Sequence, residues 1–544
     1  MKKHLQQLFL PFLLLTGITV SAQPGLEWSR DVFCDFNDFT PNFVTKPITD
    51  AQGNVYVAGA LNKDASFLNR SPVLMKFSPQ GDLLWQYVHP RLGYTPNDGH
   101  QGNSTFTDIA FDSEGNILAA GAAPYDTTVF GLKPILVKIN PQGQMLWQKI
   151  MYTDVPNLFN YGNPLCTDNE GNVYFAAIRP VSGSSATNHQ ARLWKFNAQG
   201  EQQWEHVFIY GVMYRTFIYN MEYLPGSNTV ILSGDIRITA DYWIPFISKH
   251  NTATGEQTLE KRFSTNPTSY LEAMYVNENE EVYVSLYSDD GIARIRKFDA
   301  ALEEVFVLSY KPDGSYDNNF GRIIPLSDGN LLASGYSYAT NQAVSGRAVY
   351  MKFTPSGTPL DTVVMAADAE EYFYDVAELN GELFFTGATT NSADEYALKL
   401  WRTNLQGSLL GSFVYDKTDI TYSEGFWLHV DGNAVYATGK SYKDNQSGVC
   451  LLKTLPQLLV TSLSEAMESI SFDVYPNPAL DYFVIRSETI GVEYQITDAL
   501  GRSMASGMLN DTQQVIPTAN WEKGLYLVRV HSPKGALTRK VWKY

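Results

Sequence analysis

Hydrophobic and polar residues alternate along most of the chain between residues 43 and 458. The alternation has a period of two, and the alternating segments are rich in β-branched and aromatic residues. Short strands with one buried face produce this pattern, whereas a helix would need a period of 3.6. The pattern therefore predicts an all-β fold for this part of the chain.

Two signatures recur as a pair along the same stretch. The first has the form DxxGNxYxAG and occurs at Ile48–Gly59, Ile109–Gly121 and Leu165–Ala177. The second has the form KFxPxGxxLW and follows at Val73–Gln86 and Ile135–Gln148. Weaker copies continue toward residue 455, and together they indicate eight units. A repeat of this length is typical of a solenoid or a propeller.

Each unit predicts four strands joined by two tight turns. In the first turn an Asp side chain bonds back to the backbone and Gly accepts a positive φ, and in the second turn Pro presets φ. Four such strands make one blade, so the repeat predicts an eight-bladed β-propeller. The signatures resemble the propeller repeats of secreted bacterial proteins, and the resemblance covers most of Phe43–Leu455.

The eighth unit stops after its third strand, near Leu455. Pro24–Phe33 matches the fourth-strand pattern, so we expect residues 24–33 to complete the last blade and close the ring. Trp28 would then occupy the slot of Trp85, Trp147 and Trp204 in their own blades. In the remaining units this packing slot is assigned to Leu259, Phe306, Leu360 and Leu410.

The same register predicts two unequal faces. Both glycine turns of a blade lie on one face, while the long connections emerge on the other, where binding is usually placed. We therefore expect the ligand on the long-loop face. The candidate residues are Tyr94, Tyr125, Tyr210, Tyr214, Trp243, Tyr336 and Tyr338. Aromatic residues that recur in every unit, such as Phe106 and Phe373, are better explained by blade packing.

The first residues predict a secretory signal peptide. Lys2 and Lys3 precede the apolar run Leu8–Val20, which is too short to span a membrane, and small residues follow it. Cleavage is expected after Ala22, so that residues 1–22 are removed. No other apolar run approaches membrane-spanning length, and no transmembrane segment is expected in the mature chain.

The last residues form a separate module. The sequence reads FDVYPNPALDYFVI from Phe472, ITDALGR over Ile496–Arg502 and GLYLVRV over Gly524–Val530. Seven short alternating segments predict a small seven-stranded immunoglobulin-like β-sandwich. Pro456–Ile470 has no repeat pattern. The expected domains are thus a propeller over 23–457, a linker over 458–470 and a terminal domain over 471–544.

This module resembles the type A sorting domain of the type IX secretion system of Bacteroidota. The residues at the family's motif positions are Tyr475, Pro476, Asn477, Pro478, Asp481, Gly501, Gly524, Tyr526 and Lys540. The resemblance implies passage through the periplasm and recognition by the translocon and its sorting peptidase. It also implies removal of the module, followed by attachment to surface lipopolysaccharide or release. The protein would then be secreted or lie on the outer-membrane surface.

Charge and cysteine content narrow the choice of partners. The 40 basic and 57 acidic residues give a net charge of −17, which disfavours nucleic acids and anionic membranes. Three cysteines are few and odd in number, so no disulfide framework is implied. We expect a monomer.

Known catalytic and metal-binding patterns are missing from the sequence. There is no GxSxG elbow, the histidines lack metal-ligand spacing, and TGKS at Thr438–Ser441 has Ala434 where a phosphate loop needs glycine. Asp50, Asp112 and Asp168 are expected to cap turns rather than bind calcium. The GxxLW repeats also resemble quinoprotein dehydrogenases, but that family's vicinal cysteines are absent. No cofactor, metal or catalytic residue is predicted.

The leading hypothesis is a secreted or surface propeller that binds a glycan or a protein without catalysis. A polysaccharide-active hydrolase or lyase on the same scaffold is the first alternative, since carboxylates from different blades cannot be paired from one sequence. A structural surface module without a small ligand is the second.

Overall fold

The computed structural model describes residues 25–33, 44–62, 70–90, 104–124, 132–151, 163–180, 189–210, 215–239, 242–263, 268–339, 345–365, 369–390, 395–417, 419–443, 446–459, 472–487, 492–498, 502–532 and 535–544. The chain divides into two compact units, Met1–Leu459 and Val460–Tyr544. The predictions for Ala22, Tyr94, Tyr125, Tyr214 and Gly501 lie outside the described residues.

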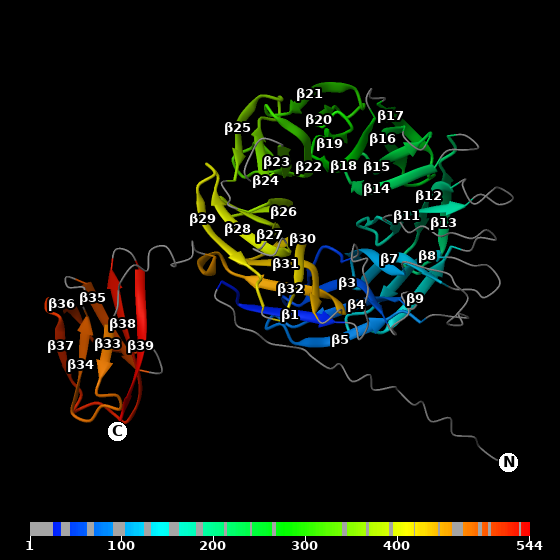
Figure 1. Cartoon of the computed structure of the whole chain (residues 1–544). Helices are drawn as coiled ribbons and strands as arrows, with labels where there is room; N and C mark the ends of the chain where they lie inside the picture. The colour runs from blue at the N-terminus through cyan, green and yellow to red at the C-terminus, as the bar shows by residue number, and fades with distance from the viewer. Residues whose placement is uncertain are drawn as a thin grey trace, which may run out of the picture. The chain divides into compact units, whose positions relative to one another are not determined.

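The first unit is a β-propeller, a ring of four-stranded antiparallel sheets, here called blades (Figure 1). Blade 1 has β2 (Ile48–Thr49), β3 (Val55–Asn62), β4 (Arg70–Phe77) and β5 (Leu83–Val88). Blade 2 has β6 (Thr105–Phe111), β7 (Ile117–Pro124), β8 (Leu132–Ile139) and β9 (Met145–Ile150). Blade 3 has β10 (Leu165–Thr167), β11 (Val173–Pro180), β12 (His189–Phe196) and β13 (Gln202–Val207). Blade 4 has β14 (Arg215–Leu224), β15 (Thr229–Arg237), β16 (Trp243–Asn251) and β17 (Gln257–Arg262).

The second half of the ring continues in the same order. Blade 5 has β18 (Ser269–Val276), β19 (Val282–Ser288), β20 (Ala293–Phe298) and β21 (Glu304–Tyr310). Blade 6 has β22 (Ser315–Pro325), β23 (Leu331–Ala339), β24 (Gly346–Phe353) and β25 (Pro359–Val364). Blade 7 has β26 (Glu371–Leu379), β27 (Glu382–Thr390), β28 (Tyr396–Asn404) and β29 (Leu409–Val414). Blade 8 has β30 (Tyr422–Asp431), β31 (Ala434–Lys443), β32 (Gln446–Thr454) and β1 (Trp28–Phe33), and the short helix η1 (Pro456–Leu458) follows.

The N-terminal strand completes the last sheet. Strand β1 pairs antiparallel with β32, from Trp28 opposite Lys453 to Phe33 opposite Gly448. Figure 1 shows blue β1 beside orange β32, where the first and last parts of the ring meet. This pairing covers an edge of β32 that would otherwise be open.

At four junctions of the ring, a tryptophan and a lysine join one blade to the next. The indole N–H of Trp85 donates to the carbonyl of Pro141 at 2.9 Å, and the ring packs where a Cβ on Gly143 would lie. Equivalent indole bonds join Trp28 to Pro79, Trp147 to Ala198 and Trp204 to Thr252. Lysines donate to these same carbonyls, as Lys138 does to Ala198 at 3.0 Å. The repeated KFxPxGxxLW signature is therefore an inter-blade fastening.

The register corrects two of the expected packing positions. The tryptophan position of the fourth strand lies four residues after the turn glycine, as Trp85 does after Gly81. In blades 6 and 7 this position is held by Asp361, which pairs with Lys352, and by Gly411, which pairs with Arg402. Leu360 and Leu410 are each one residue too early. Side chains alternate along a strand, and a slip of one residue turns Leu360 outward, where it is exposed.

The innermost strands carry a recurring bulge. The register shifts by one residue between Phe106 and Asp108 in β6, and the same shift occurs in β14, β18, β22, β26 and β30. In most blades the bulged strand comes so close to the second strand that only glycine fits there. A Cβ on Gly121 would lie 2.1 Å from the carbonyl oxygen of Thr105. This close approach explains the final glycine of DxxGNxYxAG.

Aspartates cap the first turn of several blades, as the sequence predicted. Asp50 Oδ1 accepts the backbone N–H groups of Gln52 and Asn54, and Asp112 and Asp168 accept the matching bonds in their own turns. These side chains satisfy turn amides that would otherwise lack a partner.

The second unit has seven strands in two sheets. The three-stranded sheet has the order β33 (Phe472–Tyr475), β34 (Tyr482–Ser487) and β37 (Gln513–Pro517). The four-stranded sheet has the order β36 (Ser503–Leu509), β35 (Val492–Asp498), β38 (Gly524–Ser532) and β39 (Gly535–Lys543). The number of strands agrees with the seven alternating segments of the sequence. In neither unit do the described residues form a helix long and apolar enough to cross a membrane.

Candidate functional site

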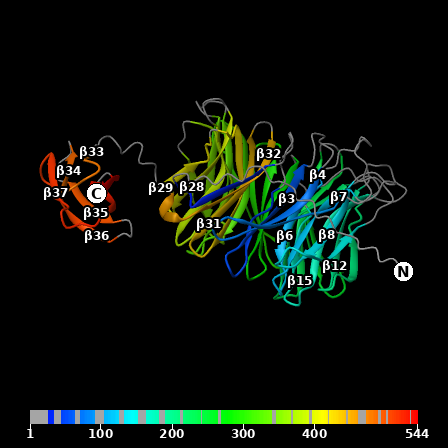
Figure 2. The ribbon, with the colours of Figure 1, turned by 90° about the horizontal axis from the view of Figure 1, so that it is seen from below.

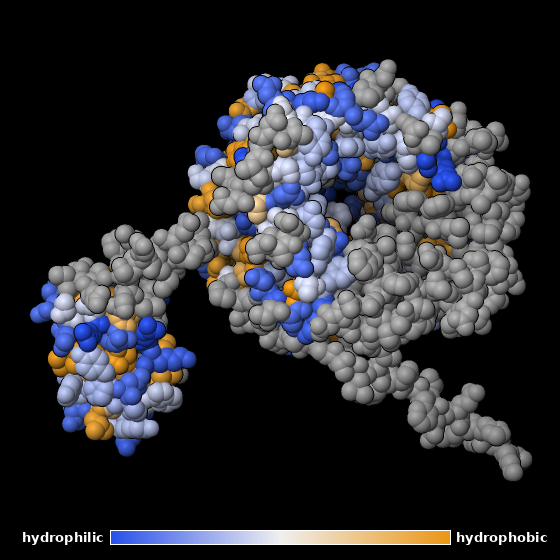
Figure 3. All heavy atoms as spheres, in the orientation of Figure 1, coloured by the Kyte–Doolittle hydropathy of each residue, from blue (hydrophilic) through white to orange (hydrophobic). Residues whose placement is uncertain are grey.

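The strands of the ring run from one face to the other (Figure 2). In each blade the first and third strands begin at the face that carries the long connections, here called the long-loop face. The tight turns lie at the opposite, short-turn face; most have a glycine at positive φ, whereas Asn228, Glu280 and Leu302 take that place in blades 4 and 5. Figure 3 shows a hollow at the centre of the ring, which the innermost strands surround.

Seven tyrosines lie at strand ends on the long-loop face of blades 6, 7 and 8. We call them the tyrosine belt: Tyr316, Tyr336, Tyr338, Tyr372, Tyr396, Tyr422 and Tyr442. The rings touch in sequence, with centroid distances of 6.0 Å for Tyr316–Tyr338, 5.6 Å for Tyr338–Tyr372 and 5.7 Å for Tyr372–Tyr396. The row continues at 5.7 Å for Tyr396–Tyr422 and 5.3 Å for Tyr422–Tyr442.

Hydrogen bonds hold the middle of the belt in place. The hydroxyl of Tyr338 donates to the hydroxyl of Tyr372 at 2.8 Å, and Tyr372 donates to the carboxylate of Glu370. Burial, followed by these hydrogen bonds, raises the pKa of Tyr372 above its ordinary value, so the hydroxyl stays protonated. Tyr316 lies at one end of the belt and is 52% exposed. The belt therefore offers fixed aromatic surface with an open edge.

The four described candidates from the sequence are divided between separate places. Tyr336 and Tyr338 belong to the tyrosine belt. Trp243 packs against Tyr270 at 5.5 Å, and Tyr270 packs against Tyr287 at 6.0 Å, so that a shorter aromatic row crosses blades 4 and 5. Tyr210 instead donates to Glu260 at 2.6 Å and lies under Arg262, which is a local packing arrangement.

Two carboxylates lie near each other beside the belt. Glu272 is the bulged residue of β18, and Asp317 lies near the start of β22. Burial within the surrounding protein raises the pKa of Glu272 to about 7, and the charge of Asp317 adds to the increase. Burial also raises the pKa of Asp317. The buried Oδ1 atoms of Asp317 and Asn319 have no hydrogen-bond partner among the described residues.

Other buried carboxylates have a structural explanation. Asp108 Oδ2 accepts the backbone N–H of Leu165 in the next blade at 2.9 Å, and Asp375 Oδ2 accepts that of Leu428 at 2.8 Å. Asp235 accepts the N–H of Leu271 in the same manner at 3.3 Å. Burial raises the pKa of Asp108 to about 7 and that of Asp235 to about 8. Since each oxygen is engaged by backbone, these aspartates join blades and are not site candidates.

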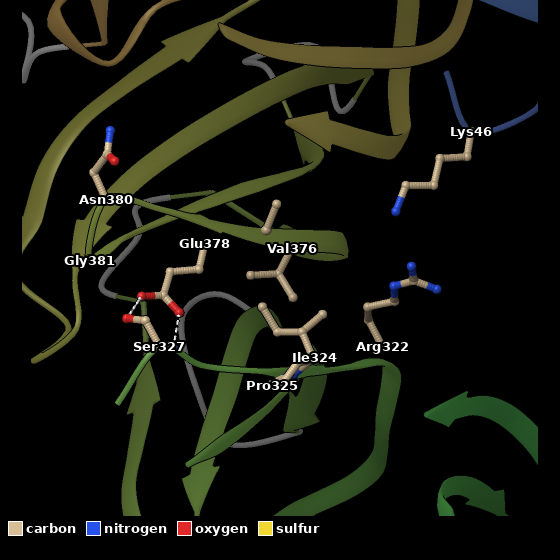
Figure 4. A pocket seen from close by; sticks show the side chains of 10 residues that line it. Lys46, Arg322, Ile324, Pro325, Ser327, Val376, Glu378, Asn380 and Gly381 are labelled. Atoms are coloured by element: carbon tan, nitrogen blue, oxygen red, sulfur yellow. Dashed lines mark hydrogen bonds between the residues drawn. The ribbon is translucent and has the colours of Figure 1, made fainter. Parts of the chain in front are cut away.

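A pocket of about 600 Å³ lies at the other end of the ring, between blades 6 and 7. It is lined by Lys46, Arg322, Ile324, Pro325, Ser327, Val376, Ala377, Glu378, Asn380 and Gly381. Most of these residues lie at or next to the first turns of their blades, and the pocket is therefore on the short-turn side (Figure 4). This was not expected from the sequence, which pointed only to the long-loop face.

The sequence reasoning missed several of these residues. Tyr442 could have been found, because it lies three residues after Gly439, as Tyr338 lies three residues after Gly335. Tyr396 and Tyr422 begin a third and a first strand and share no repeat position. Lys46 and Arg322 gave no local signal, because they come from blades 1 and 6. Among the described residues, no group of three or more His, Cys, Asp or Glu side chains is placed to hold a metal ion.

Comparison with protein families gives one match. Residues 473–543 match the family described as the secretion system C-terminal sorting domain. The second unit is a type IX secretion sorting domain. Its presence indicates export of this protein to the cell surface or into the medium. No curated protein matches the chain.

Solved structures with similar folds are distant in sequence. A quinohemoprotein alcohol dehydrogenase from Comamonas testosteroni has a TM-score of 0.46 and 10% identity, over 84% of this chain and 79% of that one. Sqt1 of Chaetomium thermophilum has a TM-score of 0.47 and 10% identity, over 77% and 97%. PorZ, a surface component of the type IX secretion system of Porphyromonas gingivalis, has a TM-score of 0.29 and 11% identity, over 93% and 81%.

Several motif residues of the sorting domain have structural contacts. Asn477 bridges to the last strand, because its Nδ2 donates to the carbonyl of Lys540 at 2.8 Å and its Oδ1 accepts the N–H of Trp542 at 2.9 Å. Tyr526 is buried and its hydroxyl donates to the carbonyl of Glu522 at 2.7 Å. The carbonyl of Asp481 accepts the N–H of Thr518. Tyr475 and the side chain of Lys540 are exposed.

Proposed function

We propose that this protein is a glycan-binding propeller, exported by the type IX secretion system and either displayed on the cell surface or released. The propeller is closed as eight blades by the strand Trp28–Phe33, and its ligand lies on the long-loop face. The sorting domain, of immunoglobulin-like type, engages the translocon and its sorting peptidase. The mature chain starts after Ala22 and acts as a monomer.

The tyrosine belt is the observation that supports this proposal most directly. Tyrosine offers a flat apolar face and a polar tip, and carries little conformational entropy, so a fixed row of rings suits the C–H faces and hydroxyls of sugars. Tyr372 is buried and bonded, whereas Tyr316 is exposed. A ligand would therefore meet a rigid surface at its exposed edge, which reduces the entropy lost on binding.

A glycan array with the full chain, followed by calorimetry on the best neutral oligosaccharide, tests the proposal. Tyr316→Ala should weaken binding at least about tenfold, in line with the loss of an aromatic contact. Tyr482→Ala is the matched control, because Tyr482 is 51% exposed but lies in the sorting domain. Equal affinities for wild type and Tyr316→Ala would refute a role of the belt.

The pair Glu272 and Asp317 supports a second candidate, a polysaccharide hydrolase. A carboxyl group with a pKa near 7 beside a second carboxylate can act as a general acid at neutral pH. If so, the glycan that binds should be shortened on incubation, and Glu272→Gln should stop product formation while binding persists. If the glycan is recovered intact, the binding function stands without catalysis.

A further inference from the structure

The pocket on the short-turn side carries a lysine, Lys46, that forms no direct bond to a carboxylate among the described residues. No hydrogen bond or ion pair joins Lys46 to the residues that the structure describes. Burial lowers the pKa of Lys46, and the positive charge of Arg322 lowers it further, although the charge of Asp375 opposes this. A lysine is seldom held in a cavity without a compensating anion, because desolvation disfavours its charged form.

The carboxylate nearest to this charge, that of Asp375, already has bonding partners. Asp375 is fully buried, and its Oδ1 lies 2.9 Å from the Nε of Arg322. Its two oxygens also accept the backbone N–H groups of Val376 and Leu428 at 2.9 Å and 2.8 Å. One carboxylate therefore faces two cations, and this end of the pocket retains a positive charge.

The rest of the pocket has an apolar middle part and a polar far side. Ile324 and Val376 form an apolar middle part that separates the cations from Glu378 (Figure 4). Glu378 is fixed at the far side, since its carboxylate accepts the N–H of Ser327 at 2.6 Å and also the Ser327 hydroxyl. Asn380 also lines the pocket, and its amide offers both donors and an acceptor.

We propose that this pocket binds a sugar acid, with the carboxylate of a uronate unit between Lys46 and Arg322. The C–H face of the ring packs on Ile324 and Val376, and ring hydroxyls bond to Glu378 and Asn380. A volume of about 600 Å³ accommodates one or two such units and lies within the usual range for ligand sites. An anionic group here would add to the charge of Asp375, the one carboxylate that faces both Lys46 and Arg322. The proposal does not rest on the tyrosine belt, which lies at the other end of the ring.

Glucuronic acid and glucose are the probes that test it, since they differ only in the carboxylate. Isothermal titration calorimetry with the full chain should show binding of glucuronic acid at least about tenfold tighter than that of glucose, as expected for a charge-assisted contact. Lys46→Gln should abolish this preference, and Lys46→Arg should retain most of it. Lys311→Gln is the control, because Lys311 is an exposed lysine that donates to a backbone carbonyl elsewhere.

Circular dichroism and the melting temperature check that each variant is folded. Tyr316→Ala should leave glucuronate binding unchanged, so that failure of the tyrosine belt and failure of this pocket give different results. Equal affinity for the two sugars in the wild type would overturn the proposal. An undiminished preference in folded Lys46→Gln would overturn it as well.

Discussion

At the scale of single residues, the ring depends on buried polar groups whose partners lie in the next blade. Asp108, Asp235 and Asp375 each accept a backbone N–H from the innermost strand that follows. An amide left without an acceptor in this interior would cost about 1–3 kcal/mol. The raised pKa values of Asp108 and Asp235 result from this burial, and they therefore report on architecture rather than on catalysis.

Asp235 predicts a pH dependence of stability. Burial raises its pKa in the folded protein to about 8, whereas an unfolded aspartate titrates near 3.9. Between these values the folded state holds one more proton than the unfolded state, so stability falls as the pH rises from 5 to 8. Asp235→Asn stays neutral throughout and should lack this part of the decline, which amounts to about 1 kcal/mol for each pH unit.

Urea midpoints of wild type and Asp235→Asn at pH 5, 6, 7 and 8 measure the effect. As the pH rises, the urea midpoint of Asp235→Asn should increase steadily relative to that of the wild type. Comparison of the pair removes the contribution of titrating groups that do not interact with Asp235. The charge of Glu272 adds to the pKa increase of Asp235, so this interaction is part of the measured effect. Parallel pH profiles would show that Asp235 is ionised in the folded state.

At the scale of elements, neighbouring blades are joined by side chains and the ring is joined at its ends by β1. Asp31 of this strand is buried, and its carboxylate accepts the hydroxyl of Ser441 at 2.9 Å and the ammonium of Lys417 at 2.7 Å. The hydroxyl of Tyr415 donates to the same carboxylate at 2.5 Å. The N-terminal strand is thus held by a buried ionic cluster as well as by its backbone ladder.

Replacement of Asp31 tests the importance of this closure. Asp31→Ala leaves Lys417 buried without its anion and should lower the unfolding free energy by about 3–5 kcal/mol. Glu27→Ala removes a more exposed ion pair, which joins the same segment to Lys453 at 3.2 Å, and should lower it by less than about 1 kcal/mol. Urea unfolding followed by tryptophan fluorescence measures both variants. If both variants lose similar amounts of unfolding free energy, the buried ionic cluster does not stabilise the ring beyond the backbone hydrogen bonds between β1 and β32.

At the scale of the whole molecule, the chain combines an all-β ring with a domain that directs its export. The two units have separate cores: Val528 and Ile496 are buried within the sorting domain, and each blade contributes apolar side chains to clusters shared with its neighbours. Each unit thus has an apolar core built from its own residues.

Deletion of residues 471–544 should leave the propeller in the periplasm of a bacterium that has the type IX system. Cell fractionation and protease accessibility on intact cells, with the full-length chain as control, measure the outcome. The truncated chain should melt at the temperature of the propeller in the full-length protein, which separates mislocalisation from misfolding. Normal surface display of the truncated chain would show that another part of the protein directs export.

The sequence by itself determined the local features of this protein. Strands, turn glycines, capping aspartates such as Asp50 and the sorting motif are readable because each depends on residues a few positions apart. It also indicated the partner of β1, since Trp28 stands in a pattern shared with Trp85. In blades 6 and 7 the predicted packing position was wrong by one residue, because no tryptophan identifies it there.

Only the tertiary structure decided which distant side chains meet. Tyr338 and Tyr372 belong to different blades, and Lys46 reaches the pocket of Arg322 from the other end of the repeat array. Ring closure brings these residues together, and its geometry depends on how the sheets twist and pack rather than on any local pattern. For the same reason the sequence identified an aromatic face but neither its continuous belt nor the charged pocket at the opposite end.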